Sequence, residues 1–262
     1  MFTKRLLVIV IFALFLSGLA TAAEAPATHP KTGEPLVCDC IKGTPSSIDG
    51  KLDDWNLQSI TPAVLDVKEQ IFTGVESWTG AQDSSGNFYL MWDNTNIYVG
   101  VVMKDDNIVV NKDGGNIWNA DAVEVFFTLP QAAATHTGVE HYQYGLTAKS
   151  QKWNWCNMEN AGQKEPDYVQ VASTTTGDGY IIEAAIDHSN MKSLNFQAGE
   201  VLGFHAVFDD TDATDREMQM TWTGREAHDQ TLGYGQFTLA SVTTAVDSSG
   251  KATLTWGAIK TK

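Results

Sequence analysis

The residues best suited to chemistry lie in one window, where a tryptophan precedes a strand that carries a carboxylate. Trp118 stands in a short loop, and Glu124 lies in the strand expected over residues 122–127. An exposed indole can stack on the apolar face of a sugar ring, and a carboxylate can accept two hydrogen bonds from hydroxyl groups. Aromatic area combined with orienting polar groups is typical of carbohydrate recognition. The alternative is a core tryptophan beside a surface glutamate, and this window alone favours that plainer interpretation.

A second group of residues, rich in aspartate, has the chemistry of a cation site. Four aspartates fall within residues 209–215, and two more stand at residues 105 and 106. Hard oxygen ligands grouped in loops suit calcium, and carboxylates this close repel one another unless a cation or water separates them. The pattern of an EF-hand loop is missing, and a solvated acidic turn is the alternative. The candidate calcium ligands are Asp105, Asp209, Asp210 and Asp212.

Other tryptophans divide into core residues and candidate binding residues. Trp55, Trp92 and Trp222 lie inside expected strand motifs and are predicted to be buried. Trp153 and Trp155 share one face of an extended segment, because side chains alternate along a strand. These two rings could form a stacking platform for a ligand, or they could pack as part of an ordinary strand. The sequence leaves both interpretations open.

Three cysteines are weaker evidence for a disulfide or a metal site. Cys38 and Cys40 stand two residues apart, on the same side of any strand, so they do not pair easily with each other. A disulfide from one of them to Cys156 is expected to be possible if the chain is exported. The odd count leaves at least one thiol over. A Cys-x-Cys motif with one distant cysteine is weak evidence for a metal site.

The elements that position these residues belong to an acidic chain with an export signal. The 262 residues contain 17 Lys and Arg against 32 Asp and Glu, which gives a formal net charge of −15. This charge excludes a chain-wide affinity for nucleic acid or anionic membranes. Residues 1–22 are predicted to be a signal peptide, because a basic start precedes an apolar run and an Ala-Thr-Ala cleavage site. The mature chain is expected to be secreted or periplasmic, without a membrane span, because no second apolar run follows.

Short alternating segments separated by turns fill the rest of the sequence. Hydrophobic residues make up 43% of the chain and charged residues 19%, enough for a real core. After an extended leader over residues 23–36, residues 37–262 are predicted to be a single all-β domain. The expected architecture is an antiparallel β-sandwich of the jelly-roll or immunoglobulin-like kind. Strands, including two hairpins, are expected at residues 88–92 with 97–103, 168–173 with 179–186, and at 122–127, 141–147, 201–208, 217–222, 235–240 and 252–256.

Several segments, taken in order, resemble the family 9 carbohydrate-binding modules, which belong to the wider group of DOMON-like β-sandwiches. The segments that carry the resemblance include 48–55 (IDGKLDDW), 91–99 (MWDNTNIYV), 118–126 (WNADAVEVF), 179–186 (GYIIEAAI) and 202–205 (LGFH). They span most of the mature chain. Members of the family bind the ends of glycan chains between two tryptophans and have no catalysis of their own. They usually accompany polysaccharide-degrading enzymes, and they carry structural calcium.

The resemblance implies a role for particular residues of this chain. Trp118 matches the first of the two family tryptophans, and Glu124 matches a carboxylate that contacts the sugar. Gln143 falls where the family has a polar strand residue, whereas the nearby family arginine is replaced here by Gly145. The loop expected to carry the second tryptophan has none, and His228 is the nearest ring at that position.

The aromatic sandwich is either incomplete, or its second wall comes from elsewhere in the chain. Trp78, Trp153 and Trp155 are the candidates. The expected binding residues are therefore Trp118, Glu124, Gln143, His228, Trp153 and Trp155. The expected partner is a plant-type polysaccharide or oligosaccharide, bound without catalysis beside glycoside hydrolases.

Two alternative functions follow from other features. A haem b-binding electron-transfer domain is one, because relatives in the same sandwich group ligate haem through methionine with histidine or lysine, although no haem motif is recognisable here. A glycoside hydrolase is the other, and it would pair Glu124 with Asp121 or Glu183 as its two carboxyl groups. Glu124 and Asp121 stand an odd number of residues apart and should face opposite sides of a strand, which argues against that pair.

Overall fold

The computed structural model describes residues 25–130, 141–156, 164–229 and 233–243. Within these ranges, thirteen strands join in one hydrogen-bonded sheet, with a few 3-10 helices between them. The strands are β1 (Val37–Lys42), β2 (Ala63–Leu65), β3 (Ile71–Thr73), β4 (Ser84–Trp92), β5 (Asn96–Asp105), β6 (Ala122–Thr128), β7 (Tyr142–Leu146), β8 (Lys152–Cys156), β9 (Val169–Thr175), β10 (Gly179–Asp187), β11 (Val201–Asp210), β12 (Met218–Thr221) and β13 (Gly235–Thr243). The 3-10 helices are η1 (Leu57–Ser59), η2 (Lys68–Gln70), η3 (Gly114–Asn119) and η4 (His188–Asn190).

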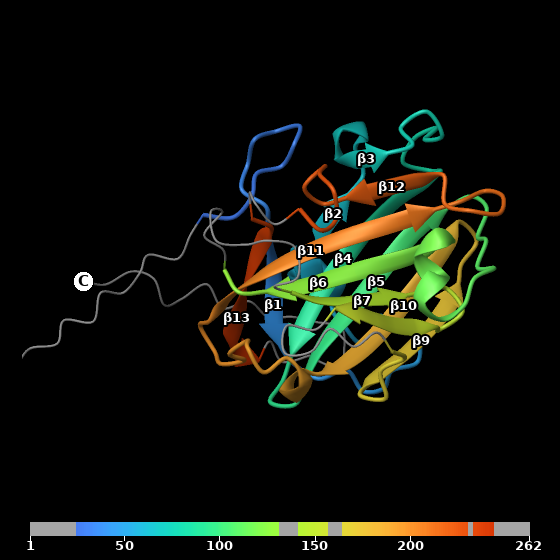
Figure 1. The fold of residues 1–262 in the computed structure, drawn as a ribbon. Helices are drawn as coiled ribbons and strands as arrows, with labels where there is room; N and C mark the ends of the chain where they lie inside the picture. Colours follow the sequence, from blue (N-terminus) through green and yellow to red (C-terminus); the bar gives the residue numbers. More distant parts are fainter. Residues whose placement is uncertain (1–24, 131–140, 157–163, 230–232, 244–262) are drawn as a thin grey trace, which may run out of the picture.

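The sheet folds over on itself to make a sandwich. Its strand order is β8-β7-β6-β11-β13-β1-β4-β5-β10-β9, and β12 extends from β11 to reach β3. Strands β11, β6 and β7 lie over β4, β5 and β10 in Figure 1. Pairing is antiparallel except at β1, which runs parallel to both β13 and β4. The predicted all-β sandwich is confirmed.

The core between the two layers comes from the inward half of each alternating strand. Side chains of β6 point inward at every second residue, as β-strand geometry requires. Among the buried residues that meet there are Val123, Val125 and Phe127 from β6, Phe204 and Phe208 from β11, and Phe88, Val101 and Ile182 from the opposite layer. Both expected hairpins are confirmed, as β4 with β5 and β9 with β10. The strand expected at residues 252–256 lies outside the described residues.

The three tryptophans predicted to be buried are buried. Trp55, Trp92 and Trp222 are 0%, 2% and 3% exposed. Because a buried indole N–H needs an acceptor, Trp55 donates to Glu183 Oε1 at 2.9 Å and Trp92 donates to the carbonyl of Ala240 at 3.1 Å. These tryptophans stabilise the sandwich and are not available to a ligand.

The segment before β1 lies against the domain. The backbone N–H of Ala27 donates to the carbonyl of Tyr234 at 2.8 Å, and Leu36 is buried. A β-bridge joins Thr28 to Pro35. In the described part of the chain, no helix is both long enough and apolar enough to cross a membrane.

The expectation of a disulfide to Cys156 is wrong. Cys38 and Cys40 are buried in β1, and no disulfide joins either of them to Cys156 in β8. Four strands separate β1 from β8 in the sheet order, so the thiols lie too far apart to bond. Burial raises the pKa of the Cys38 thiol far above its usual range, which keeps it protonated.

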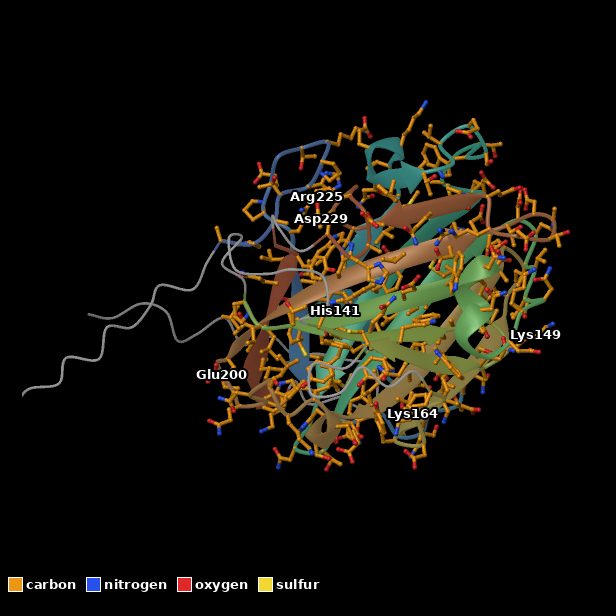
Figure 2. All side chains as sticks on the ribbon, viewed as in Figure 1. His141, Lys149, Lys164, Glu200, Arg225 and Asp229 are labelled. Atoms are coloured by element: carbon orange, nitrogen blue, oxygen red, sulfur yellow. The ribbon has the colours of Figure 1, made fainter. Side chains whose placement is uncertain are left out.

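The outer face of β6 and β11 is also covered, here by the chain that follows β12. Phe126, Val207, Ala227 and Tyr234 form a small apolar cluster under this cover. The buried ring of His205 stacks on Tyr234 with 4.4 Å between centroids and 9° between planes. Figure 2 shows Arg225 and Asp229 close together in the covering segment, and their charged groups are 3.6 Å apart.

His205 makes the stability of the domain sensitive to acid. Its two ring nitrogens have no hydrogen-bond partner among the described residues, and burial holds its pKa well below the usual value. Below pH ~6.5 the unfolded chain therefore binds a proton that the folded chain does not, so stability falls as the pH is lowered.

We expect His205→Phe to keep the ring stack on Tyr234 and to remove this proton. Between pH 7 and pH 5 the variant should lose about 2 kcal/mol less unfolding free energy than the wild type. Urea unfolding at the two pH values measures the difference. His141, whose pKa burial lowers to about 4, leaves a residual slope in both proteins. Equal pH slopes for the variant and the wild type would show that His205 is not the source.

Candidate functional site

A groove of about 670 Å³ crosses the outer face of the layer that contains β6 and β11. Strands β3, β12, β6, β7 and β8 contribute to it, together with η3 and the loops on either side of β12. The residues that define its chemistry are Trp118, Glu124, Gln143, Trp155, Arg216 and Gln219.

The groove brings together five of the six predicted binding residues. Trp118, Glu124, Gln143, His228 and Trp155 all line it. Trp153 does not, because its ring packs against the backbone of η3, where a Cβ added to Gly115 would stand 3.2 Å from the Trp153 Nε1. Trp153 therefore packs against η3 and lies outside the groove, whereas Trp155 lines it.

The helix η3 presents Trp118 to the groove. Ile117 is buried and anchors the helix, whereas the Trp118 side chain is 36% exposed. The Arg216 guanidinium lies 4.8 Å from the centre of the Trp118 ring, close enough for a cation–π contact. Asn119 fixes the other side of the helix through hydrogen bonds with Asp215 at 2.7 Å and with the Arg216 backbone at 3.0 Å. The indole is thus both exposed and held in place.

Glu124 lies at the bottom of the groove rather than on the surface. Its neighbours in β6, Val123 and Val125, point into the core, so Glu124 points outward, but it is only 3% exposed. Gln143 donates to Glu124 Oε2 at 2.5 Å. The Gln143 amide oxygen is 3.1 Å from His228 Nε2, so this row of polar groups runs from the floor to the rim.

Asp209 lies beneath the groove, where two lining residues donate hydrogen bonds to it. It is fully buried and accepts hydrogen bonds from Arg216 Nη1 at 2.7 Å and from Gln219 Nε2 at 2.8 Å. Burial raises the pKa of the Glu124 carboxyl well above its usual range, and the negative charge of Asp209 raises it further. Burial also raises the pKa of Asp209, but the charge of Arg216 opposes that shift. These shifts favour the protonated form of Glu124, which donates a hydrogen bond as well as accepting one.

Trp155 lies over β7 because residue 145 is a glycine. A Cβ at Gly145 would come within 2.2 Å of the Trp155 ring, so any other side chain would displace the indole. Trp155 Nε1 donates to the carbonyl of Gly115 at 2.9 Å, which fixes the ring against η3. The position where the resemblance implies an arginine is thus filled by an indole, and Arg216 places a guanidinium in the groove from a different segment.

Among the groove residues that the sequence did not predict are Gln219, Arg216 and Phe72. Alternation along the strand could have placed Gln219 on the outer face, since it stands between the buried Met218 and Met220 of β12. Arg216 follows the aspartate-rich turn and showed no pattern of its own. Phe72 stands in a strand of three residues, too short for any periodicity, yet it is 45% exposed and lines the groove.

The aspartates predicted to bind calcium fall into separate places. Asp105 and Asp210 meet Asp121, and each offers a carboxylate oxygen within 4.8 Å of the others. Asp212 instead approaches two other aspartates, Asp83 and Asp106. Asp209 points toward the groove side, where it bonds to Arg216 and Gln219, because adjacent residues of a strand face opposite sides and β11 continues through Asp210. The prediction that residues 209–215 form one acidic loop is therefore wrong at its start.

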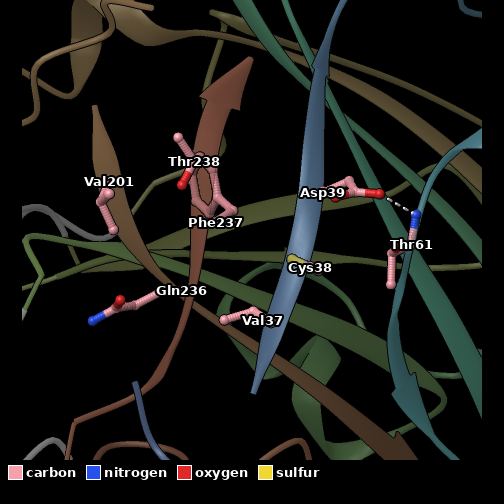
Figure 3. A pocket seen from close by; sticks show the side chains of 8 residues that line it. All are labelled: Val37, Cys38, Asp39, Thr61, Val201, Gln236, Phe237 and Thr238. Carbon is pink, nitrogen blue, oxygen red and sulfur yellow. Dashed lines mark hydrogen bonds between the residues drawn. The ribbon is translucent and has the colours of Figure 1, made fainter. Parts of the chain in front are cut away.

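A second hollow, of about 340 Å³, lies beside the parallel pair β1 and β13 (Figure 3). Its carboxylate, Asp39, already accepts a hydrogen bond from the backbone of Thr61 at 2.7 Å. Its one aromatic lining residue, Phe237, is 1% exposed and so offers no open ring face. The groove is the better candidate for a ligand site.

This chain is similar in sequence to one part of each of two much longer proteins. The chain is 28% identical over 211 residues to exoglucanase XynX of Acetivibrio thermocellus, covering 78% of this chain and 17% of that protein. It is 27% identical over 177 residues to endo-1,4-beta-xylanase A of Thermotoga neapolitana, covering 67% of this chain and 15% of that protein. The chain thus spans less than a fifth of either relative.

Solved structures share the fold at low sequence identity. A family 9 carbohydrate-binding module of Caldicellulosiruptor kristjanssonii in complex with cellotriose superposes with a TM-score of 0.58 and 18% identity, covering 83% of this chain and 98% of that one. A carbohydrate-binding module of the same family and organism in complex with glucose also gives 0.58, with 19% identity, covering 79% and 97% of the two chains. Residues 48–242 match the family described as carbohydrate family 9 binding domain-like. The chain is therefore a carbohydrate-binding module that belongs to family 9.

Proposed function

We propose that the groove binds oligosaccharide stretches of plant-type polysaccharides, such as β-linked glucose or xylose chains, and that it does so without catalysis in support of glycan degradation. The observation that carries this proposal is the exposed Trp118 ring, fixed by Arg216 above a floor of buried hydrogen-bonding groups. The ring offers apolar area, and the floor offers donors and acceptors for hydroxyl groups. The similarity to an exoglucanase and a xylanase, and to modules with cellotriose and glucose, favours these sugars.

The positions of Glu183 and Asp121 argue against the carboxyl pairs that the glycoside hydrolase alternative would use. Glu183 lies in β10 of the opposite layer, where it accepts hydrogen bonds from Trp55, Asp49 and Gly50. Asp121 belongs to the aspartate cluster with Asp105 and Asp210. Neither residue lines the groove with Glu124, so neither of the two carboxyl pairs expected from the sequence faces a ligand there.

The haem alternative has little support from the packing. Met103, Met218 and Met220 are at most 1% exposed in the core between the layers, and His188 stacks on Phe196 at 4.3 Å. Thioether and imidazole groups in these places do not face a common cavity among the described residues. Met158, another methionine that could ligate haem, lies outside the described residues.

We also propose that Asp105, Asp121 and Asp210 hold a structural calcium ion. Burial raises the pKa of all three carboxyls, to about 6 for Asp105, about 9 for Asp121 and about 7 for Asp210. Asp105 Oδ2 is buried and has no hydrogen-bond partner among the described residues. Hard carboxylate oxygens with unmet negative charge suit calcium, and bound calcium would screen the repulsion among them.

The proposal also includes export of the chain from the cytoplasm. Residues 1–22 would direct the chain out of the cytoplasm and be removed, and the glycan-binding domain over residues 37–262 would act beside secreted or periplasmic glycoside hydrolases. Comparing the N-terminal sequence of the protein from the culture medium or periplasm with that of the primary product tests this placement.

Trp118→Ala should weaken binding of cellotriose or xylotriose by at least about tenfold, because loss of a central aromatic contact typically costs more than 1 kcal/mol. Isothermal titration calorimetry measures the change, and near-ultraviolet circular dichroism checks the fold. Leu129→Ala removes another exposed apolar side chain outside the groove and serves as the control. Wild-type affinity in a folded Trp118→Ala protein would place the sugar elsewhere.

Removal of calcium should lower the thermal midpoint of the wild type by about 5–10 °C, the effect of a few kcal/mol of linked binding in a domain of this size. Differential scanning calorimetry in EDTA and in excess calcium measures it. Asp121→Asn should abolish the difference between the two conditions, whereas Asp53→Asn, at an exposed site, should keep it. A wild-type thermal midpoint that is the same in EDTA and in excess calcium would exclude a calcium site here.

A further inference from the structure

We propose that the groove takes an internal stretch of a glycan chain, with Phe72 as a second stacking platform distinct from Trp118. This inference rests on the proposed glycan-binding function and specifies its ligand as a chain of several sugars rather than a chain end.

The exposure of Phe72 is the first observation. Among the described residues, Phe72 and Trp118 are the two aromatic side chains that are exposed, at 45% and 36%, and both line the same groove. Exposed aromatic area is unfavourable in water, so its concentration along one groove marks a surface built to be covered. The polar residues that line the same groove select a ligand with hydroxyl groups rather than an apolar one.

The strand pairing sets the distance that such a ligand would span. Phe72 lies in β3, and successive neighbours from there are β12, β11, β6, β7 and β8, which carries Trp155. Five strand spacings make about 24 Å between the two backbone ends of the groove. Gln219, Glu124 and Gln143 line the floor along this path. A single sugar covers only part of this length, whereas an oligosaccharide covers all of it.

The loop after β12 brings no second indole into the groove within its described residues. A chain end enclosed between two aromatic rings requires a second ring opposite Trp118. The described part of the loop after β12 instead contributes Ala227 and His228 to the groove, along with Glu226. Ala227 is small and His228 is held by Gln143, so this side offers no indole to close over a terminal sugar.

Phe72 is held in position on both sides along the chain. Before it, the Gln70 side chain is buried and donates to the carbonyls of Val64 at 2.8 Å and Trp222 at 3.4 Å. After it, Gly74 has a φ of +76°, and a Cβ there would stand 1.8 Å from the Glu217 carbonyl oxygen. A platform fixed before binding loses little conformational entropy when the ligand arrives.

Titration calorimetry with cello- and xylo-oligosaccharides of one to six sugars tests the proposal. The wild type should bind hexaose more tightly than glucose or xylose, and borohydride reduction of the terminal sugar of the hexaose should change the affinity less than twofold. Phe72→Ala should weaken hexaose binding about fivefold or more while leaving monosaccharide binding unchanged. Phe72→Trp should restore binding, and Val75→Ala, at an exposed apolar neighbour, should have no effect.

The outcomes separate the two proposals. If the wild type binds sugars but Phe72→Ala matches it at every chain length, or if reduction of the terminal sugar abolishes binding, the internal-chain mode is wrong and the glycan site around Trp118 stands. If the folded wild type binds none of these sugars, the proposed function itself fails, and the inference fails with it.

Discussion

Strands β6 and β11 are buried on both faces, and the rest of the molecule is arranged around this constraint. Inward residues such as Val123 and Phe204 join the apolar core, whereas outward residues such as Glu124 and Asp209 are polar but almost equally buried. Buried polar groups are costly unless they are hydrogen-bonded. Arg216, from the segment before β12, supplies one of the required partners. The covering segments and the binding groove therefore both depend on the outward-facing polar residues of β6 and β11.

The charge balance of these residues connects packing with binding. Arg216 and Gln219 donate to Asp209, and the charge of Arg216 opposes the rise that burial causes in the pKa of Asp209. The pKa of the neighbouring Glu124 is raised well above its usual range by burial. Arg216 in turn holds the Trp118 ring in its place. A sugar thus meets groups that other protein contacts have already oriented, which reduces the entropy lost on binding. The fold and the affinity of the site depend on the same few hydrogen bonds.

The sequence predicted what regular alternation can reveal. The pattern over residues 122–127 placed Glu124 opposite the core-facing valines, and the order of strand motifs predicted the sandwich. The sequence did not predict the placement of side chains that depends on contacts between distant segments. The run of aspartates predicts a loop at Asp209, whereas β11 extends through Asp210. Strand alternation groups Trp153 with Trp155, although the two rings contact η3 in different ways. Phe72 could not be found, since its role arises only from the pairing of β3 with β12.

The most direct test of the central claim is a nuclear magnetic resonance titration that follows the indole N–H signals of the tryptophans as cellohexaose or xylohexaose is added. The signals of Trp118 and Trp155 should shift with a common dissociation constant, because both rings line the groove. Those of Trp55 and Trp92 should stay in place, because both are buried and hydrogen-bonded within the fold. Saturable binding that leaves Trp118 and Trp155 unchanged would contradict the assignment of the groove as the glycan site.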